Sequence, residues 1–370
     1  MSSFSIHPVI EQYESFEDYA AVAKLCEKDL LFTNEFIYEP FMKAYAGETK
    51  VLFQERYGRG EPSDEMMDAI RKDMPEGIER IIAVGGGTVI DIAKILSHGG
   101  DWAVEDLYLG KVVAPKVHEL VVIPTTCGTG SEMTNVAVSA LVKQNTKKGL
   151  ALDSMYPDRA VLIPEMVKTL PYKFFATSSI DAMIHAAESY LSPKANAFTE
   201  MFSERALELI LSGYRFLEAE GTEKWTERAG DFLLASNYAG IAFGNAGVGA
   251  VHALSYPLGG AYHIPHGESN MLMFSEVFRK YKEKKPVGKI NQLEEMLGRI
   301  LGVPAEASLD ALADLLNVVL PLNKLHEYGV KESDLPVFTE SVITGQQRLL
   351  NNNYVELTAE DMMAIYTARF

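Results

Sequence analysis

The chain has 370 residues, of which 47% are hydrophobic and 23% are charged. This composition is typical of folded globular proteins, and the length predicts two or three domains rather than a disordered chain. Lys and Arg number 34 against 51 Asp and Glu, a formal net charge of −17. That charge disfavours nucleic acid and anionic membranes as partners, because both are negative themselves.

Two cysteines, Cys26 and Cys127, are too few for a disulfide framework or a cysteine-based zinc site. The N-terminal segment carries acidic residues where a secretory signal needs basic residues followed by an apolar run. The sequence also lacks an apolar run of about 18 residues, the length that a transmembrane helix requires. We therefore expect a cytoplasmic protein with no membrane partner.

The first half of the chain alternates short apolar runs with amphipathic segments. The predicted strands are 29–33, 50–54, 80–84 and 119–124, with helices over 63–74 and 88–98 between them. Runs that are apolar throughout indicate strands covered on both faces, and strand–helix–strand repetition predicts a parallel α/β sheet. The segments 136–142 and 148–153 are expected to form a hairpin appended to that sheet.

Around residues 164–171 the pattern changes to helical periodicity almost without β-like runs. Helices are predicted over 180–192, 199–219, 223–243, 290–301, 308–320 and 358–370. The first of these is expected to start after Ser178 and Ser179 and to end by Pro193. We therefore place a domain boundary near residue 168, with an α/β domain over 1–168 and an all-helical domain over 169–370.

A glycine-rich turn joins the predicted strand 80–84 to the helix that follows it. Gly85, Gly86 and Gly87 allow a ligand to approach the backbone closely, and the N–H groups at a helix start attract phosphate. The sixth position of a G-x-G-x-x-G beginning at Gly85 is Ile90, and no Gly-Lys-Ser/Thr ends the turn, so neither common nucleotide fingerprint is present. A tight turn without a ligand remains an alternative for this motif alone.

A second loop, PTTCGTGSE at 124–132, follows the next predicted strand. Two such loops at neighbouring strand ends form the crevice in which open α/β sheets bind nucleotides. The sequence therefore favours a nucleotide site at this edge of the sheet.

One carboxylate and three imidazoles in the second half could form a divalent-metal site. Asp181 and His185 are spaced i and i+4, which places both on one face of a helix. His252 and His266 lie in two glycine-containing segments further along. Such a set could leave a coordination position open for substrate. Each residue alone could equally be a helix cap or a buried core histidine, so the residues by themselves leave the metal site open.

Four motifs, in this order, resemble the iron-containing (group III) alcohol dehydrogenase family across nearly the whole chain. They are GGGTVIDIAK, PTTCGTGSE, SSIDAMIHAAESYLS and VHALSYPLGGAYHIPHGESN. The resemblance implies an N-terminal dinucleotide-binding α/β domain like that of dehydroquinate synthase and a helical metal-binding domain, with the active site in the cleft between them. It also implies a homodimer.

The resemblance further implies NAD and Fe²⁺, or Zn²⁺, as cofactors, and roles for particular residues. The implied metal ligands are Asp181, His185, His252 and His266. The implied contacts of the cofactor pyrophosphate are Gly85, Gly86, Gly87 and Thr88, with Asp91 and Lys94 completing that motif. The other implied cofactor contacts are Thr125, Thr126 and Lys147.

Two positions depart from the family pattern. Tyr256 stands where many relatives carry a further histidine implicated in proton transfer, so Tyr256 and His263 are both candidates for that role here. Asn34 stands where many relatives place an aspartate that contacts the adenosine ribose. Asparagine can still bind the ribose but carries no charge to repel a 2′-phosphate, which weakens the preference for NAD over NADP without reversing it.

The implied reaction is the reversible, NAD(H)-linked interconversion of a primary alcohol and its aldehyde. The likeness is greatest to the branch that acts on 4-hydroxybutyrate and succinic semialdehyde. Alternatives are the same chemistry on a 1,2-diol or a simple alcohol such as butanol, a lyase of the dehydroquinate synthase branch, and a nucleotide-binding protein without activity. A substrate carboxylate would need a cation or several hydrogen-bond donors, and the sequence does not indicate which residue supplies them.

Overall fold

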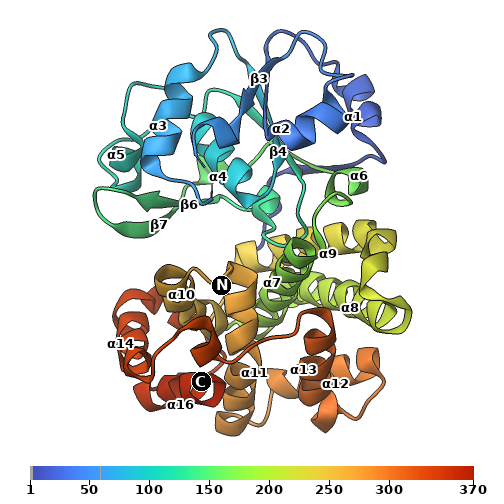
Figure 1. The fold of residues 1–370 in the computed structure, drawn as a ribbon, viewed down its shortest axis with the longest axis vertical. Coiled ribbons are helices and arrows are strands. Elements are labelled where there is room, and N and C mark those ends of the chain that lie inside the picture. Colours follow the sequence, from blue (N-terminus) through green and yellow to red (C-terminus); the bar gives the residue numbers. More distant parts are fainter. Residues whose placement is uncertain (1–2, 59) are drawn as a thin grey trace. The chain divides into compact units, whose positions relative to one another are not determined.

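The computed structural model describes residues 3–58 and 60–370, which form two compact units. One unit is Ile6–Leu170, and the other is Pro171–Phe370 together with the N-terminal segment that ends at Ser5. Figure 1 shows the first in blue to green and the second in green to red. The division follows Leu170, close to the boundary expected near residue 168.

The extreme N-terminus differs from the expectation, because it belongs with the helical unit. The backbone of Ser5 exchanges two hydrogen bonds with the side-chain amide of Asn245, at 2.9 and 3.0 Å. The ring of Phe4 stacks on that of Phe198, with 5.1 Å between centroids. Sequence patterning could not reveal these contacts, since they join residues far apart in the chain.

The α/β unit is built on a six-stranded sheet in the order β1-β8-β5-β4-β2-β3, and all of its strand pairs are parallel. The strands are β1 (Val9–Gln12), β2 (Asp29–Thr33), β3 (Lys50–Phe53), β4 (Arg80–Gly85), β5 (Glu119–Pro124) and β8 (Arg159–Leu162). The four predicted strands are confirmed. The sequence analysis did not predict β1 and β8; β1, at the edge of the sheet, is mostly exposed and has no continuous apolar run.

Helices cover both faces of this sheet, as continuous apolar strands predict. They are α1 (Phe16–Ala23), α2 (Glu35–Ile37), α3 (Asp64–Asp73), α4 (Gly87–Leu96), α5 (Val104–Tyr108) and α6 (Pro164–Val167). Successive residues of one strand point to opposite faces. In β4, Ile81 therefore packs into the core beneath α3, α4 and α5, while Ile82 packs into the core on the α1 side.

The predicted hairpin is present as a separate two-stranded antiparallel sheet. Its strands are β6 (Val136–Leu141) and β7 (Thr146–Ala151), so the second begins two residues before the predicted 148. Asn145, in the turn, adopts a left-handed conformation with φ of 47°, which asparagine tolerates better than most residues. A β-bridge between Ser63 and Ala140 joins the hairpin to the segment that precedes α3.

The helical unit is arranged around α7, which is buried along most of its length. Its helices are α7 (Tyr172–Leu191), α8 (Ala197–Glu220), α9 (Ala229–Ala246), α10 (Ala250–Tyr262), α11 (His266–Lys284), α12 (Lys289–Leu301), α13 (Ser308–Val319), α14 (Leu335–Gly345), α15 (Gln347–Leu350) and α16 (Ala359–Arg369). Helices α8, α9 and α11 pack directly against α7. Among the helices of residues 3–58 and 60–370, none combines the length and apolar composition needed to cross a membrane.

The start of α7 corrects one prediction. The helix begins at Tyr172, directly after Pro171, and not after Ser178 and Ser179. Both serines lie inside the helix and donate their hydroxyls to backbone carbonyls three residues earlier, at 3.1 and 3.2 Å. Because these local hydrogen bonds satisfy the hydroxyls, serine is tolerated within the helix.

Candidate metal and nucleotide sites

Four side chains from three helices of the helical unit converge on one point. Asp181 and His185 lie one turn apart on α7, His252 lies in the first turn of α10, and His266 is the first residue of α11. The Nε2 atoms of the three histidines lie 3.9, 3.5 and 3.8 Å from the same carboxylate oxygen, Oδ1 of Asp181. The structure thus brings together the four residues on which the metal hypothesis depends.

Ring stacking fixes the orientation of the buried imidazoles. The His185 ring lies between those of Phe243 and His252, with centroid separations of 4.2 and 4.7 Å. His185, His252 and Asp181 are all buried, whereas the His266 side chain is 45% exposed. His266 is therefore the accessible member of the cluster.

A close helix approach places His266 beside Asp181. A Cβ atom on Gly267 would lie 2.0 Å from the carbonyl oxygen of Thr177 and 3.4 Å from Cβ of Asp181. The first distance is far inside van der Waals contact, so only glycine allows the start of α11 to lie this close to α7. The residue after the fourth candidate ligand thereby controls the position of that ligand.

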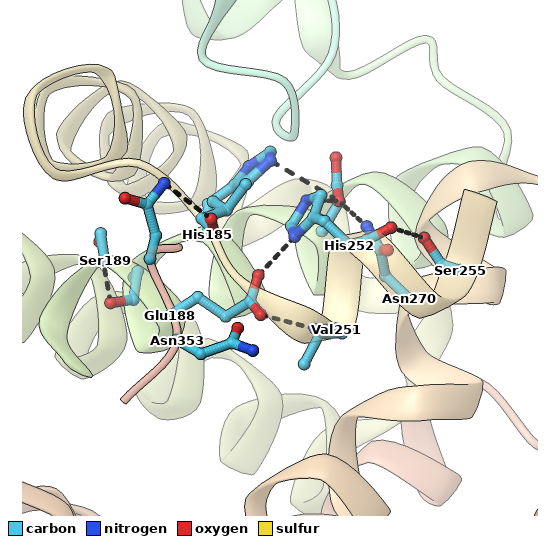
Figure 2. A network of polar contacts seen from close by, with 12 residues as sticks. His185, Glu188, Ser189, Val251, His252, Ser255, Asn270 and Asn353 are labelled. Carbon is cyan, nitrogen blue, oxygen red and sulfur yellow. Dashed lines mark hydrogen bonds and ion pairs between the residues drawn. The ribbon is translucent and has the colours of Figure 1, made fainter. Parts of the chain in front are cut away.

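Glu188 orients His252. The Glu188 carboxylate accepts a hydrogen bond from Nδ1 of His252 at 2.6 Å and one from the backbone N–H of Val251 at 2.7 Å. Figure 2 shows Glu188 reaching both the His252 ring and the Val251 backbone. Since Nδ1 carries the donated proton, the lone pair of the neutral ring is on Nε2, which faces Asp181.

The surroundings of Nε2 in His252 favour a positively charged partner at that atom. This atom is buried and has no hydrogen-bond partner among the described residues. Burial alone lowers the pKa of His252, but its interactions with Asp181 and Glu188 raise that pKa to about 9. The two carboxylates therefore favour a positive charge at this ring.

Asp181 is held in its anionic form. Burial opposes ionisation of its carboxyl, but the influence of His185, His266 and His252 outweighs burial and holds the pKa of Asp181 well below its usual range. The amide of Asn270 donates to Oδ1 of Asp181 at 2.7 Å and lies 3.2 Å from Nε2 of His266. A negative oxygen therefore lies at the centre of the cluster.

Asp181, His185 and His252 fit a divalent ion in spacing and in chemistry, and Nε2 of His266 lies 3.8 Å from the same Asp181 oxygen. Two ligands at about 2.1 Å from a tetrahedral ion lie about 3.4 Å apart, and the Nε2–Oδ1 distances of 3.5 to 3.9 Å are close to that value. The ligand atoms of Asp181, His185 and His252 all lie within 4.8 Å of one another. Three imidazole nitrogens and one carboxylate oxygen suit Fe²⁺ and Zn²⁺.

In the α/β unit, the glycine turn forms the N-terminus of α4. Gly85 ends β4, Gly86 is the N-cap, and Gly87 and Thr88 are the first residues of the helix. The free N–H groups there form the positive end of the helix dipole, which attracts phosphate. A Cβ atom on Gly87 would lie 3.0 Å from the side chain of Thr129. The turn is therefore packed tightly against the second loop.

Thr125 and Thr126 begin the second loop, at the end of β5. The backbone N–H of Thr125 donates to the carbonyl oxygen of Gly85 at 3.0 Å. A Cβ atom on Gly86 would lie 3.2 Å from the methyl group of Thr126. Oγ1 of Thr126 is buried and has no hydrogen-bond partner among the described residues. An unpaired hydroxyl beside the glycine turn suits a polar ligand.

Comparison with known proteins decides the family. A family model described as iron-containing alcohol dehydrogenase matches residues 10–164, and one described as the C-terminal part of the Fe-containing alcohol dehydrogenase family matches residues 175–370. The chain is 51% identical over 367 residues to a 4-hydroxybutyrate dehydrogenase from Clostridium kluyveri, an alignment that covers 99% of each chain. The chain belongs to the iron-containing alcohol dehydrogenase family.

Other relatives agree with this assignment. Long-chain-alcohol dehydrogenase 1 of Geobacillus thermodenitrificans is 35% identical over 78% of this chain and 74% of its own. Among solved structures, sulfoacetaldehyde reductase from Bifidobacterium kashiwanohense in complex with NAD⁺ has a TM-score of 0.88 and 23% identity, covering 100% of this chain and 98% of that one. The predicted fold class, an α/β unit with a parallel sheet followed by a helical unit, is confirmed.

The two proton-transfer candidates of this alcohol dehydrogenase lie in different surroundings. Tyr256 is one turn after His252 on α10, and its ring centroid is 6.0 Å from that of His266. His263 is the exposed C-cap of the same helix and has a left-handed φ of 55°. Among the described residues, its side chain makes no hydrogen bond, ion pair or ring contact with the four clustered side chains. The structure thus brings Tyr256, and not His263, next to the cluster.

Asp91 and Lys94, expected to complete the cofactor motif, lie on the buried face of α4. Nζ of Lys94 donates to Oγ of Ser131 at 2.6 Å and to the carbonyl of Val136 at 2.7 Å. The Asp91 carboxylate accepts from the same Ser131 hydroxyl at 2.7 Å. Burial lowers the pKa of Lys94 to about 8, although the Asp91 charge opposes that shift, and burial raises the pKa of Asp91. The pair ties α4 to the second loop and the hairpin.

Lys147, the remaining predicted cofactor contact, lies on β7 and forms an ion pair with Glu61. Asn34 follows β2, and its amide donates to the carboxylate of Glu55 at 2.8 Å. Neither interaction was expected, because in each pair the two residues are distant in sequence.

The sequence reading missed three residues of these sites. Glu188 follows Asp181 at i+7 and His185 at i+3, so the same helical spacing that selected the ligands could have found it. Asn270 lies at i+4 from His266 and could have been found in the same way. Glu55 gave no signal, since only the pairing of β2 with β3 brings it next to Asn34.

Proposed function

We propose that this protein is an NAD(H)-linked, metal-dependent dehydrogenase that interconverts 4-hydroxybutyrate and succinic semialdehyde. The observation that carries the proposal is the convergence of one buried carboxylate and three imidazoles on one point, in a chain 51% identical to a 4-hydroxybutyrate dehydrogenase. The proposed ligands are Asp181, His185, His252 and His266. The proposed cofactor contacts are Gly85, Gly86, Gly87, Thr88, Thr125 and Thr126.

The overall reaction removes a hydride and a proton from the alcohol, so RCH₂OH and NAD⁺ give RCHO, NADH and H⁺. A divalent ion held by the four ligands would supply a Lewis acid that lowers the pKa of the alcohol. Glu188 keeps Nε2 of His252 directed at that point, and Asp181 keeps its negative charge there. Tyr256 lies against the accessible ligand His266 and is the nearer of the two proposed proton-transfer residues.

The far end of a carboxylate substrate needs a cation, and we propose Arg348 for that role. It lies on α15, which packs against α10, the helix of His252 and Tyr256. Burial raises the pKa of Tyr256, and the positive charge of Arg348 is the largest influence that lowers it. The Arg348 side chain is exposed and has no hydrogen bond or ion pair among the described residues.

In this proposal the carboxylate of 4-hydroxybutyrate would face Arg348, and its hydroxyl would face the four clustered side chains. A guanidinium can bind a carboxylate through two parallel hydrogen bonds.

Steady-state kinetics test the substrate. With protein loaded with Fe²⁺ or Zn²⁺ and with NADH present, we expect kcat/KM for succinic semialdehyde to exceed that for butanal by about a hundredfold, since the site would hold a charge that butanal lacks. If succinic semialdehyde is left unreduced while butanal or a hydroxyaldehyde is reduced readily, the alternative, a simple primary alcohol or a 1,2-diol, replaces this proposal.

Further parts of the assignment are proposals of the same kind. The unit Ile6–Leu170 would be the NAD-binding domain and the helical unit the metal-binding domain of a cytoplasmic homodimer. Light scattering on the purified protein tests the dimer. Metal analysis after anaerobic purification tests the remote alternative, a nucleotide-binding protein without activity: about one divalent ion per chain supports the enzyme, and metal-free protein supports the alternative.

A further inference from the structure

At the sheet edge that carries the glycine turn, the acidic side chain follows β3, whereas β2 is followed by a neutral residue. In open α/β sheets, a carboxylate at the end of the strand next to the glycine turn commonly binds the adenosine ribose. Here that neighbouring strand is β2, and the residue after it is the neutral Asn34. The carboxylate comes instead from one strand further along the sheet: Glu55 lies in the short helix Gln54–Arg56 that directly follows β3.

Asn34 and Glu55 form a fixed pair. The Asn34 amide donates to one carboxylate oxygen of Glu55 at 2.8 Å, and the backbone N–H of Glu35 donates to the other at 2.6 Å. Because β2 and β3 are adjacent parallel strands, their carboxyl ends meet at the same edge of the sheet. The Glu55 carboxylate is thus held where β2 by itself would have presented an acid.

Within residues 3–58 and 60–370, Glu55 differs from its acidic neighbours in having no cationic partner. Glu39 forms an ion pair with Lys43 at 2.8 Å, and Glu35 lies 3.6 Å from Arg56. Both hydrogen bonds to Glu55 come from neutral donors, and among the described residues no lysine or arginine forms an ion pair with it. No cation among the described residues therefore neutralises the Glu55 carboxylate.

This carboxylate lines a cavity large enough for a nucleoside. The cavity has a volume of about 730 Å³, and its lining includes Glu35, Phe36, Glu39 and Glu55. Small-molecule sites typically have volumes of about 300–1,000 Å³. Phe36 is 71% exposed, so its ring is free to stack on a base. The cavity combines an open aromatic ring with a carboxylate that forms no ion pair with the described residues.

We propose that Glu55, held by Asn34, accepts the hydroxyls of the adenosine ribose and repels a 2′-phosphate, so that this chain selects NAD over NADP. The inference rests on the proposed function, in which the glycine turn binds the cofactor pyrophosphate. It also gives a reason for Asn34. Two carboxylates at hydrogen-bond distance cannot both stay ionised, so an acid on β3 requires a neutral donor on β2.

Fluorescence titration of the purified protein with NADH and with NADPH tests the proposal, because binding needs neither metal nor substrate. We expect wild type to bind NADH more tightly. Glu55→Gln should lower the ratio of the two affinities by about tenfold or more, mainly through tighter binding of NADPH. The control is Glu79→Gln, which removes the same charge next to the amino end of β4, at the opposite edge of the sheet, and should leave the ratio unchanged.

A charge swap tests the pairing itself. Asn34→Asp alone should weaken NADH binding, since it places a second carboxylate against Glu55. Combined with Glu55→Gln it should restore both NADH binding and selectivity. If Glu55→Gln and Glu79→Gln give the same ratio, or if wild type binds NADPH more tightly, the role of Glu55 is refuted while the NAD(P)-linked activity stands. Wild type that binds neither nucleotide overturns this inference and the proposed function together.

Discussion

Glu188→Gln is the most direct test of how the metal site is held. The substitution keeps the shape of a side chain that is 3% exposed but removes its charge and one of its two acceptor oxygens. The two hydrogen bonds of Glu188, at 2.6 Å to His252 and 2.7 Å to Val251, both need an acceptor. Glutamine can accept only one of them and turns a donor toward the other.

The expected loss follows from these contacts. A hydrogen bond to a charged group contributes about 1.5–3 kcal/mol, and tenfold in affinity corresponds to about 1.4 kcal/mol. Losing one such bond should therefore weaken metal binding by about 10- to 100-fold, the range typical of groups that orient metal-binding histidines. Competition with a chelator of known affinity measures this change directly.

Ser255→Ala is the matched control for Glu188→Gln. The Ser255 hydroxyl donates to the backbone carbonyl of His252 at 2.9 Å, so it contacts the same residue without touching the imidazole. Its removal should leave metal affinity within about twofold of wild type. If Glu188→Gln retains wild-type affinity, or loses no more than Ser255→Ala, then Glu188 does not orient His252 and the account of this site is wrong.

Three further substitutions test other parts of the structure. Gly267→Ala should displace α11 from α7 and release the metal, because its Cβ would lie 2.0 Å from a backbone carbonyl oxygen. The control Gly260→Ala should retain the metal, because its Cβ would meet nothing within 4 Å. Metal content and the thermal midpoint of both variants check this. Lys94→Met should lower thermal stability, since it leaves Asp91 buried without its partner. In the folded protein the pKa of Lys94 is lowered to about 8 from 10.5. Between these two pH values the unfolded chain holds the proton while the folded protein has released it, so wild type gains stability relative to the variant as pH rises, by at most about 1.4 kcal/mol per pH unit. Calorimetry at about pH 7 and pH 9.5 measures this trend, and a stability difference between wild type and variant that narrows with pH contradicts it. Arg348→Gln should raise KM for succinic semialdehyde about tenfold or more and leave butanal unaffected; equal effects on both aldehydes would argue against a carboxylate contact.

Local chemistry along the chain was enough to predict much of this protein. The apolar runs of β2, β4 and β5 and the three glycines after β4 are signals carried by consecutive residues, and the structure has those elements where they were expected. The i, i+4 spacing of Asp181 and His185 likewise specifies one helical face, whatever surrounds that helix. Such features need no knowledge of what packs against them.

Tertiary structure decided everything that depends on neighbours distant in sequence. The sequence could not show that the Lys94 side chain joins α4 to the second loop and the hairpin in a buried network, or that the carboxylate beside Asn34 comes from the segment that follows β3. Nor could it show that Gly267 sets how closely α11 approaches α7. For Lys94, Asn34 and Gly267 alike, strand order or helix packing determines which residue lies next to them. Spacing along the chain determines which side chains share a face, and only the fold determines what that face meets.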